Sequence, residues 1–378
     1  MTSETAEPST SPAESAIQFA TARKILEDAI AARAFPGCAF GVLAEGRVLL
    51  QGALGRFVYD DAAPAVMPET VFDVASVTKV AATTAAAMLL NRRGRLDLET
   101  ALGDLLPGFM IGRPPGTFAR YIKLRHLLAH SAGLPAYVEF FREHTTPAGL
   151  IRACLEVPIE TPPGERAEYS DPGFILLGKA LEVVLGEPLS LWVEREIFRP
   201  LGMHSSGFRP RGEARLAIPP TEEDATFRHR VIQGEVQDEN AYVLNGCAGH
   251  AGLFTNVPDL LRLAGEILAA AQHPSAAEPA KLFERATVEL FSERQEPEGS
   301  SRALGWDTPS ENSSSGRHFS PRSIGHLGFS GCSLWIDLDA GVAVALLTNR
   351  TWPDRANQAI KEVRPAFHDA VREALGDG

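Results

Sequence analysis

The tetrapeptide Ser76-Val77-Thr78-Lys79 places a hydroxyl and an amine three residues apart, directly after the apolar stretch 71–75. If a helix begins here, three residues turn it through nearly a full circle, so the two side chains share one face. A serine becomes a nucleophile when a neighbouring group takes its proton, and an amine with a lowered pKa can do so. The dipole of a helix N-terminus opposes a protonated lysine and favours an adjacent oxyanion. The spacing therefore predicts nucleophilic catalysis at Ser76, with Lys79 as its activating group.

The alternative is that Lys79 is exposed and Ser76 only caps a helix. Residues 80–90 argue against this alternative, because they are small or apolar on almost every face of the expected helix. Such a helix is expected to be buried on all sides, which places Lys79 near an interior of low dielectric constant.

The elements that must position this pair follow from the distribution of apolar and turn-forming residues. Apolar spacing predicts helices over residues 17–34, 124–130, 173–185, 189–198, 258–271 and 360–375. Short apolar segments between turn residues predict strands over residues 39–43, 47–51, 323–328, 333–337 and 342–348. We therefore expect an α/β (α+β) fold: an antiparallel sheet built from both termini and flanked by helices, with an inserted, mostly helical lobe.

The expected domain organisation follows the same pattern. Residues 1–15 are polar, acidic and proline-containing, and they lack the basic start and apolar core of a signal peptide, so we expect a disordered tail. We expect residues 16–80 and 250–378 to form the sheet domain and residues 81–249 to form the helical lobe. The active site is expected at their interface.

Composition limits the function and the location. The 378 residues carry a formal net charge of −12, which argues against nucleic acid or an anionic membrane surface as a partner. No apolar run reaches the length of a transmembrane helix. The four cysteines are scattered without a C-x-x-C pair, so we expect free thiols in a reducing cytoplasm. A small molecule is the expected partner, and the sequence does not indicate an oligomeric state.

Further segments make the chain resemble a known superfamily. They are Tyr169-Ser170-Asp171 before a helix, residues 325–331 (GHLGFSG) entering a strand, residues 124–135 (LRHLLAHSAGLP), and residues 238–241, 249–254 and 334–337. With the S-x-x-K motif, in this order and at these separations, they resemble the serine β-lactamase and penicillin-binding superfamily. The class C β-lactamase-like branch, which includes esterases, peptidases and amidases, is the most similar. The resemblance covers roughly residues 20–375.

The resemblance implies a mechanism and its residues. Ser76 would attack an acyl carbon to form an acyl-enzyme, Lys79 would hold or relay the proton, and Tyr169 would be a partner base. The backbone N–H groups of Ser76 and Phe329 would form the oxyanion hole. Tyr169 needs a lowered pKa for its role, which Lys79 and a protonated His326 could supply. No cofactor and no metal are implied, and whether Lys79 or Tyr169 is the acylation base stays open.

Two departures from the superfamily pattern concern the predicted substrate-binding residues. His326-Leu327-Gly328 stands where the superfamily usually has Lys-Thr/Ser-Gly, so recognition of a substrate carboxylate should be weaker. Asp171 stands where the Y-x-N motif has asparagine, and a carboxylate can only accept hydrogen bonds. Asp171 can also pair with Lys79 and hold it protonated, which works against the helix dipole. The sequence leaves open which effect dominates.

The remaining histidines have simpler explanations. His126 and His130 are four residues apart and could bind a metal ion, but no third ligand appears and helix packing is favoured. His250 lies next to a glycine in an expected loop and is interpreted as structural. His326 could likewise be a buried histidine with hydrogen-bonded ring nitrogens.

The sequence therefore predicts a serine hydrolase that acts on small esters or amides, with weak β-lactamase activity as a side reaction. A D-stereospecific peptidase, a transacylase and a true class C-type β-lactamase remain alternatives. A penicillin-recognising sensor, which is acylated without turnover, is a non-enzymatic alternative. A metallohydrolase that uses His126, His130 or His250 is the least favoured.

Overall fold

The computed structural model describes residues 17–272, 279–297 and 300–376. The predicted tail, residues 1–15, lies outside the described residues.

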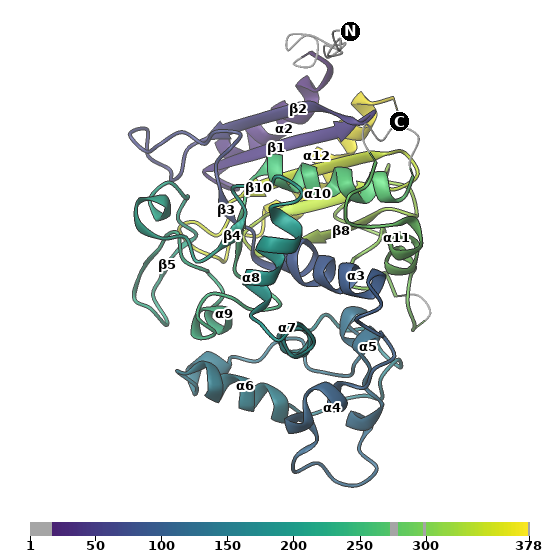
Figure 1. Ribbon diagram of the computed structural model, residues 1–378. Helices are drawn as coiled ribbons and strands as arrows, with labels where there is room; N and C mark the ends of the chain where they lie inside the picture. Colours follow the sequence, from purple (N-terminus) through teal and green to yellow (C-terminus); the bar gives the residue numbers. More distant parts are fainter. Residues whose placement is uncertain (1–16, 273–278, 298–299, 377–378) are drawn as a thin grey trace.

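A five-stranded antiparallel sheet with the order β2-β1-β10-β9-β8 is the largest sheet among the described residues. Its strands are β1 (Gly37–Ala44), β2 (Arg47–Gly55), β8 (Ile324–Leu327), β9 (Ser333–Asp337) and β10 (Val342–Thr348). Strands from both ends of the chain therefore lie side by side, as the first and last colours of Figure 1 show. This arrangement confirms the predicted sheet.

Helices cover both faces of this sheet because its central strands have apolar residues on both sides. Cys38, Phe40 and Val42 of β1 pack in one core with α2 (Ala20–Ala31) and α12 (Ile360–Ala374). The alternate residues Ala39 and Leu43 belong to the second core, which includes α10 (Val257–Ala270). Since successive side chains of a strand point to opposite faces, one continuous apolar strand supports two helical layers.

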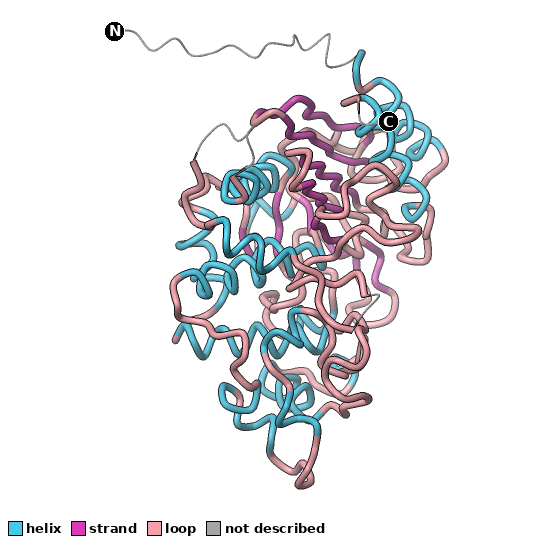
Figure 2. The backbone as a smooth tube through the Cα atoms, turned by 90° about the vertical axis from the view of Figure 1, so that its right-hand side faces the viewer, coloured by secondary structure: helices cyan, strands magenta, loops and turns pink. Residues whose placement is uncertain are grey.

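The helices of the middle of the chain lie to one side of the sheet (Figures 1 and 2). They are α3 (Ala85–Arg92), α4 (Leu102–Leu105), α5 (Leu124–Leu128), α6 (Pro147–Glu156), α7 (Asp171–Leu185), α8 (Leu189–Val193) and α9 (Glu239–Val243), and α11 (Arg285–Ser292) follows α10. The predicted helices at 124–130, 173–185 and 189–198 correspond to α5, α7 and α8 with the π-helix η6 (Glu194–Phe198).

Short strands interrupt this helical region and were not predicted. They are β3 (Phe72–Asp73), β4 (Gly207–Phe208), β5 (Glu222–Asp224), β6 (Arg230–Ile232) and β7 (Leu253–Thr255). They form the small sheet β3-β7-β4 and the hairpin β5-β6. Two or three residues are too few for an alternating pattern to appear in the sequence.

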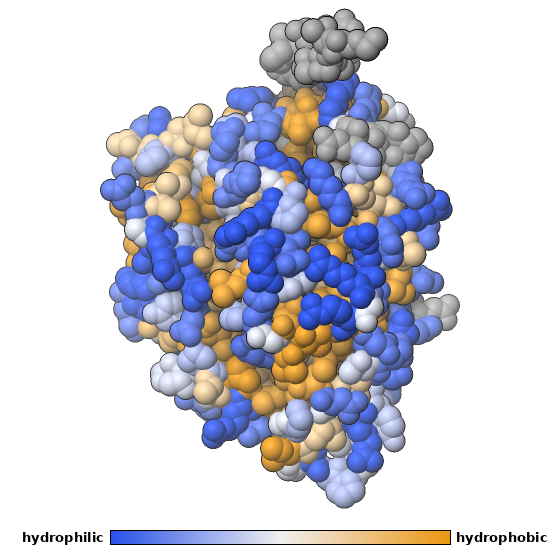
Figure 3. Space-filling view, viewed as in Figure 1, coloured by the Kyte–Doolittle hydropathy of each residue, from blue (hydrophilic) through white to orange (hydrophobic). Residues whose placement is uncertain are grey.

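The predicted domain boundaries, at residues 80/81 and 249/250, stay predictions. Within the described ranges, no helix is both long enough and apolar enough to cross a membrane. The face in Figure 3 is mainly hydrophilic, and its apolar colour gathers in the lower half, where α6 and α7 lie in Figure 1.

Candidate active site

Ser76 lies in a tight turn between β3 and a buried helix. Residues Ala75–Val77 form a 3₁₀ turn, the π-helix η2 (Lys79–Thr84) follows, and α3 continues the same run. Lys79 is the first residue of the π-helix, three residues after Ser76, and its Nζ reaches Ser76 Oγ at 3.1 Å. The predicted helix is present, although its first two turns are not α-helical.

The backbone before Ser76 is strained. Ala75 has a φ of +46°, a conformation that costs a non-glycine residue free energy and persists only when neighbours hold it. Asp73 Oδ1 accepts the Ala75 N–H at 2.9 Å, and Asp73 Oδ2 accepts the Gln237 N–H at 2.7 Å. Asp73 thus ties the turn to the segment before α9. Asp73 was not predicted as a functional residue, because it lies within an apolar stretch and no motif marks it.

Lys79 is fully buried and makes three hydrogen bonds. Its Nζ donates to Ser76 Oγ, to Asp171 Oδ1 at 2.6 Å and to the His250 carbonyl at 3.2 Å. Burial lowers the pKa of the Lys79 ammonium, but Asp171 and Tyr169 together raise this pKa above its ordinary value. The ion pair with Asp171 therefore dominates over the helix dipole, and Lys79 is a cation near neutral pH.

Tyr169 donates its phenolic O–H to Ser76 Oγ at 2.7 Å. Its ring packs between His130, at 4.7 Å between ring centres, and His326, at 6.0 Å. Burial and Asp171 raise the pKa of Tyr169, and the opposing effect of Lys79 is smaller. The site therefore holds a neutral phenol.

Lys79 lowers the pKa of Tyr169 as predicted, but burial and Asp171 outweigh it, and the predicted contribution of a protonated His326 is wrong. His326 is buried, and this burial, together with repulsion from Lys79 and Arg302, moves its pKa well below the ordinary value. His326 Nδ1 lies 2.8 Å from the Leu327 carbonyl, which can only accept, so this nitrogen carries the proton of a neutral ring. No second cation from His326 therefore acts on Tyr169.

The predicted oxyanion donors lie on two segments that pack against each other. A Cβ on Gly328 would lie 2.3 Å from the Val74 carbonyl oxygen, so only glycine permits this approach. Ser330 Oγ donates to the Asp73 carbonyl at 2.7 Å and joins the same segments. Within the described part of the chain, the N–H groups of Ser76 and Phe329 have no hydrogen-bond acceptor. Both donors are therefore available.

The segment 249–253 anchors the nucleophile helix. Thr83 Oγ1 donates to the Gly249 carbonyl at 2.6 Å, and Thr78 Oγ1 accepts the Leu253 N–H at 3.0 Å. His250 Nε2 lies 2.9 Å from Asp238 Oδ1, so the His250 side chain fixes the loop whose carbonyl receives Lys79. This contact agrees with a structural role for His250.

His126 and His130 each accept a backbone N–H through Nδ1, from Lys123 at 3.1 Å and from Ser170 at 3.0 Å. The His126 ring therefore helps to hold the start of α5, and the His130 ring helps to hold the loop before α7. Across the described ranges, no group of three or more His, Cys, Asp or Glu side chains is placed to hold a metal ion.

A cavity of about 640 Å³ opens over Ser76. Its lining includes Tyr169, Asp171 and the predicted residues His326, Leu327 and Gly328, together with Phe329 and several arginines.

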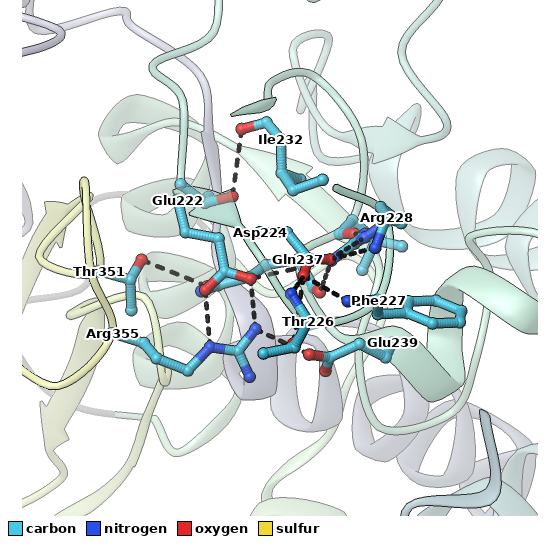
Figure 4. A network of polar contacts seen from close by, with 12 residues as sticks. Glu222, Asp224, Thr226, Phe227, Arg228, Ile232, Gln237, Glu239, Thr351 and Arg355 are labelled. Atoms are coloured by element: carbon cyan, nitrogen blue, oxygen red, sulfur yellow. Dashed lines mark hydrogen bonds and ion pairs between the residues drawn. The ribbon is translucent and has the colours of Figure 1, made fainter. Parts of the chain in front are cut away.

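Part of the cavity lining belongs to the network of Figure 4. In this network Arg355 pairs with Glu222 and with Glu239, at 2.8 Å from Glu239 Oε1. Arg228 and Asp224 form a buried ion pair at 2.9 Å behind it. Because Arg355 lies 133 residues from Glu222 and 116 from Glu239, spacing alone could not predict these ion pairs.

Comparisons with known proteins agree with the geometry. A family model described as "Beta-lactamase" matches residues 22–366. In an alignment of 383 positions, the chain is 31% identical to an N-acetylmuramyl-L-alanine amidase of Bacillus subtilis, covering 91% of this chain and 84% of that one. It is 30% identical to a putative D-alanyl-D-alanine carboxypeptidase of Salmonella typhi, covering 86% of this chain and 81% of that one.

Solved structures share the fold. EstCE1, described as a hydrolase with promiscuous acyltransferase activity, superposes with a TM-score of 0.73 at 24% identity, covering 94% of this chain and 98% of that one. A β-lactamase from Sulfitobacter sp. EE-36 gives a TM-score of 0.73 at 20% identity, covering 96% and 99%. The superfamily and the fold predicted from the sequence are confirmed.

Proposed function

Because this chain belongs to the β-lactamase family of serine hydrolases, we propose that it cleaves small esters or amides through an acyl-enzyme on Ser76. One observation carries the proposal. Tyr169 OH and Lys79 Nζ lie 2.7 and 3.1 Å from Ser76 Oγ, beneath a cavity large enough for a small substrate.

In the proposed acylation, Ser76 Oγ attacks the carbonyl carbon of the substrate. The N–H groups of Ser76 and Phe329 stabilise the oxyanion, which is usually the largest catalytic contribution. The phenolate form of Tyr169 takes the serine proton and then delivers it to the leaving group. Water completes the cycle by hydrolysing the acyl-enzyme.

The assignment of Tyr169 as the base follows from the charges. Lys79 stays protonated beside Asp171, so it holds a cation 4.8 Å from the centre of the Tyr169 ring. A fixed cation at this distance lowers the pKa of Tyr169, although burial and Asp171 outweigh it, so the phenolate is a minority form that grows as the pH rises. Asp171 therefore makes Lys79 an electrostatic group and leaves the proton transfer to Tyr169.

Steady-state kinetics with aryl esters, simple amides and a chromogenic cephalosporin test this proposal. We expect ester turnover to exceed cephalosporin turnover, because Leu327 offers no hydroxyl to a β-lactam carboxylate. Ser76→Ala should abolish turnover of all three, whereas Ser205→Ala, at an exposed serine, should not change it. Cephalosporin turnover orders of magnitude above ester turnover would reverse the ranking.

Peptide amides are the second candidate, since the relatives named above are an amidase and a putative D-alanyl-D-alanine carboxypeptidase. Product analysis with D- and L-amino-acid amides, with and without an added alcohol acceptor, separates a D-specific peptidase from a transacylase. A sensor would instead give a lasting adduct on Ser76 with no steady-state product.

A cytoplasmic location is part of the proposal. Its support is that all four cysteines are free thiols, at positions 38, 154, 247 and 332. Fractionation of the natural source with an antibody against this chain would test it, and recovery from the culture medium would contradict it.

A further inference from the structure

The end of β8 has lost the donors with which the superfamily is expected to bind a carboxylate. Leu327 has no donor, and the one ring proton of His326 is used by the Leu327 carbonyl. A different cation, Arg302, lines the same cavity. Arg302 belongs to none of the predicted motifs.

The backbone fixes Arg302 beside β8. Residues Arg302 and Asp307 form an antiparallel bridge, and Asp307 forms another with Gly325, directly before His326. The guanidinium carbon of Arg302 lies 5.6 Å from the centre of the Tyr169 ring. Since Tyr169 OH is 2.7 Å from Ser76 Oγ, the side chain of Tyr169 links this cation to the proposed nucleophile.

The pairing of Arg302 is incomplete. Its nearest carboxylate oxygen, Asp307 Oδ2, lies 3.6 Å from Arg302 Nη1, beyond hydrogen-bond distance. The other oxygen of Asp307 accepts Ser301 Oγ at 2.7 Å and the Thr308 N–H at 3.1 Å. Among the described residues, no acceptor lies within hydrogen-bond distance of the Arg302 guanidinium, and its side chain is 24% exposed.

The other arginines of the cavity are already engaged. Arg364 donates to the carbonyls of residues 328, 331 and 332, and Arg350 donates to those of residues 329, 355 and 357. Arg355 is held by Glu222 and Glu239. Arg302 is therefore the arginine of the lining that is best able to accept a new partner.

We propose that Arg302 binds a carboxylate of the substrate and so makes the enzyme selective for acidic esters or amides. A guanidinium offers two parallel N–H groups to a carboxylate, an arrangement that gives both orientation and free energy. Recognition would thus move from the end of β8 to the bridge that carries Arg302. The inference rests on the proposed acylation of Ser76. Weak recognition of a carboxylate is still expected at the end of β8, where the carboxylate of a β-lactam would bind.

The test compares substrates that differ in one group. Aryl esters whose leaving group is 3-hydroxybenzoate or 3-hydroxybenzamide form one pair, and 4-nitrophenyl esters of glutarate or glutaramate form the other. We expect wild-type kcat/KM to favour the carboxylate in at least one pair by about tenfold or more. Arg302→Gln should remove this preference while changing kcat/KM for the neutral substrate less than about threefold.

Two further variants separate specific binding from general charge. Arg302→Lys should keep part of the preference, because a lysine is a point charge without the planar fork. Lys361→Gln, which removes another cation of the lining, should keep all of it. Equal rates within both pairs in the wild type, or an equal loss on acidic and neutral substrates in Arg302→Gln, would overturn the inference.

Covalent labelling tests the inference even if the proposed hydrolysis fails. An anionic aryl phosphonate monoester and its neutral diester can both react with an activated serine, and intact-mass spectra give the labelling rates. The ratio of the anionic to the neutral rate should fall about tenfold or more in Arg302→Gln. An unchanged ratio contradicts the role of Arg302, whereas absence of labelling at Ser76 by either reagent contradicts both proposals.

Discussion

The two sides of the cavity differ in how their charged and polar groups are paired. On the side of the nucleophile, Lys79 contacts Asp171 at 2.6 Å, and His250 contacts Asp238 at 2.9 Å. On the side of β8, Arg302 Nη1 is 3.6 Å from its nearest carboxylate oxygen, beyond hydrogen-bond distance. We call the first group the paired side and the second the unpaired side.

This difference indicates that the two sides have different roles. Pairing fixes protonation states and positions, which suits the groups that move the serine proton. Unpaired donors and acceptors cost free energy in the unbound enzyme and recover it when a ligand supplies the missing partner. The paired side therefore suits the chemistry, and the unpaired side suits substrate selection.

Removal of the Lys79 ammonium, at the centre of the paired side, should have the largest effect on activity. Lys79→Ala should lower kcat/KM by about 10³-fold or more, since it removes the cation beside Tyr169 and Ser76. It should also lower the free energy of unfolding by about 3–5 kcal/mol, because Asp171 is left as an unpaired, mostly buried charge. Ester kinetics and urea unfolding check both values.

The control for this variant is Lys179→Ala, which removes a lysine from a surface pair with Glu182. It should change stability by less than about 1 kcal/mol and leave the rate unchanged. If Lys79→Ala were as stable and as active as this control, the paired side would have no special role.

Removing the phenolic oxygen of Tyr169, on the paired side, should lower the rate without lowering the stability. Tyr169→Phe should lower kcat by about 10²- to 10⁴-fold, the range for loss of a general acid–base group. The fold should change little, because the ring contacts with His130 and His326 remain. Tyr59→Phe, which loses a hydrogen bond to the Arg33 carbonyl, is the matched control and should retain wild-type kcat.

The pH–rate profile should sharpen the comparison. Asp171 raises the pKa of both Lys79 and Tyr169, and the phenolate of Tyr169 forms only as the pH rises toward the pKa. Wild-type kcat/KM should therefore increase from pH 7 into the alkaline range. Asp171→Asn should move the rise to lower pH.

Glu182→Gln is the control for the pH experiment, since it neutralises a surface carboxylate paired with Lys179. It should leave the profile in place. A profile of Asp171→Asn that stays unchanged, or moves to higher pH, would show that Asp171 does not set the proton affinity of the site.

The smallest effect on activity should come from substitution of Asp73, which joins the two sides. Burial raises the pKa of Asp73 to about 6, against the backbone hydrogen bonds that lower it. A raised pKa in the folded state stabilises the fold below the unfolded pKa near 4, and this stabilisation is lost as the pH rises through 6. Asp73→Asn removes this contribution, so the stability difference between wild type and variant should grow by up to about 3 kcal/mol from pH 7 to pH 4.

The activity of Asp73→Asn should fall by about tenfold, because an asparagine cannot accept both the Ala75 and the Gln237 N–H groups. Urea unfolding at several pH values and ester kinetics measure the two effects. Parallel stability curves for wild type and variant would contradict the raised pKa.

Local patterns were sufficient to predict much of the fold and the core of the site. The apolar run 80–90 predicted a buried helix behind Lys79, and all of residues 80–90 are buried. The pairing of β1 with β10 follows from two apolar segments at opposite ends of the chain, because each needs partners for its backbone hydrogen bonds.

Charge and protonation could not be predicted in the same way. The state of Lys79 depends on a carboxylate 92 residues away, and the lowered pKa of His326 depends on its burial and on the cations Lys79 and Arg302. Arg302 reaches the cavity only because a backbone bridge places it beside β8. Spacing can therefore identify the reacting groups, but their proton affinities depend on distant partners.

Rapid-quench mass spectrometry of the enzyme during turnover of an aryl ester tests the central claim most directly. The account predicts a transient mass increase equal to one acyl group, located by peptide mapping on the hydroxyl of Ser76. Ser76→Ala should show no such species and no turnover. An acyl group on another residue, or turnover at the full rate without Ser76, would contradict the account.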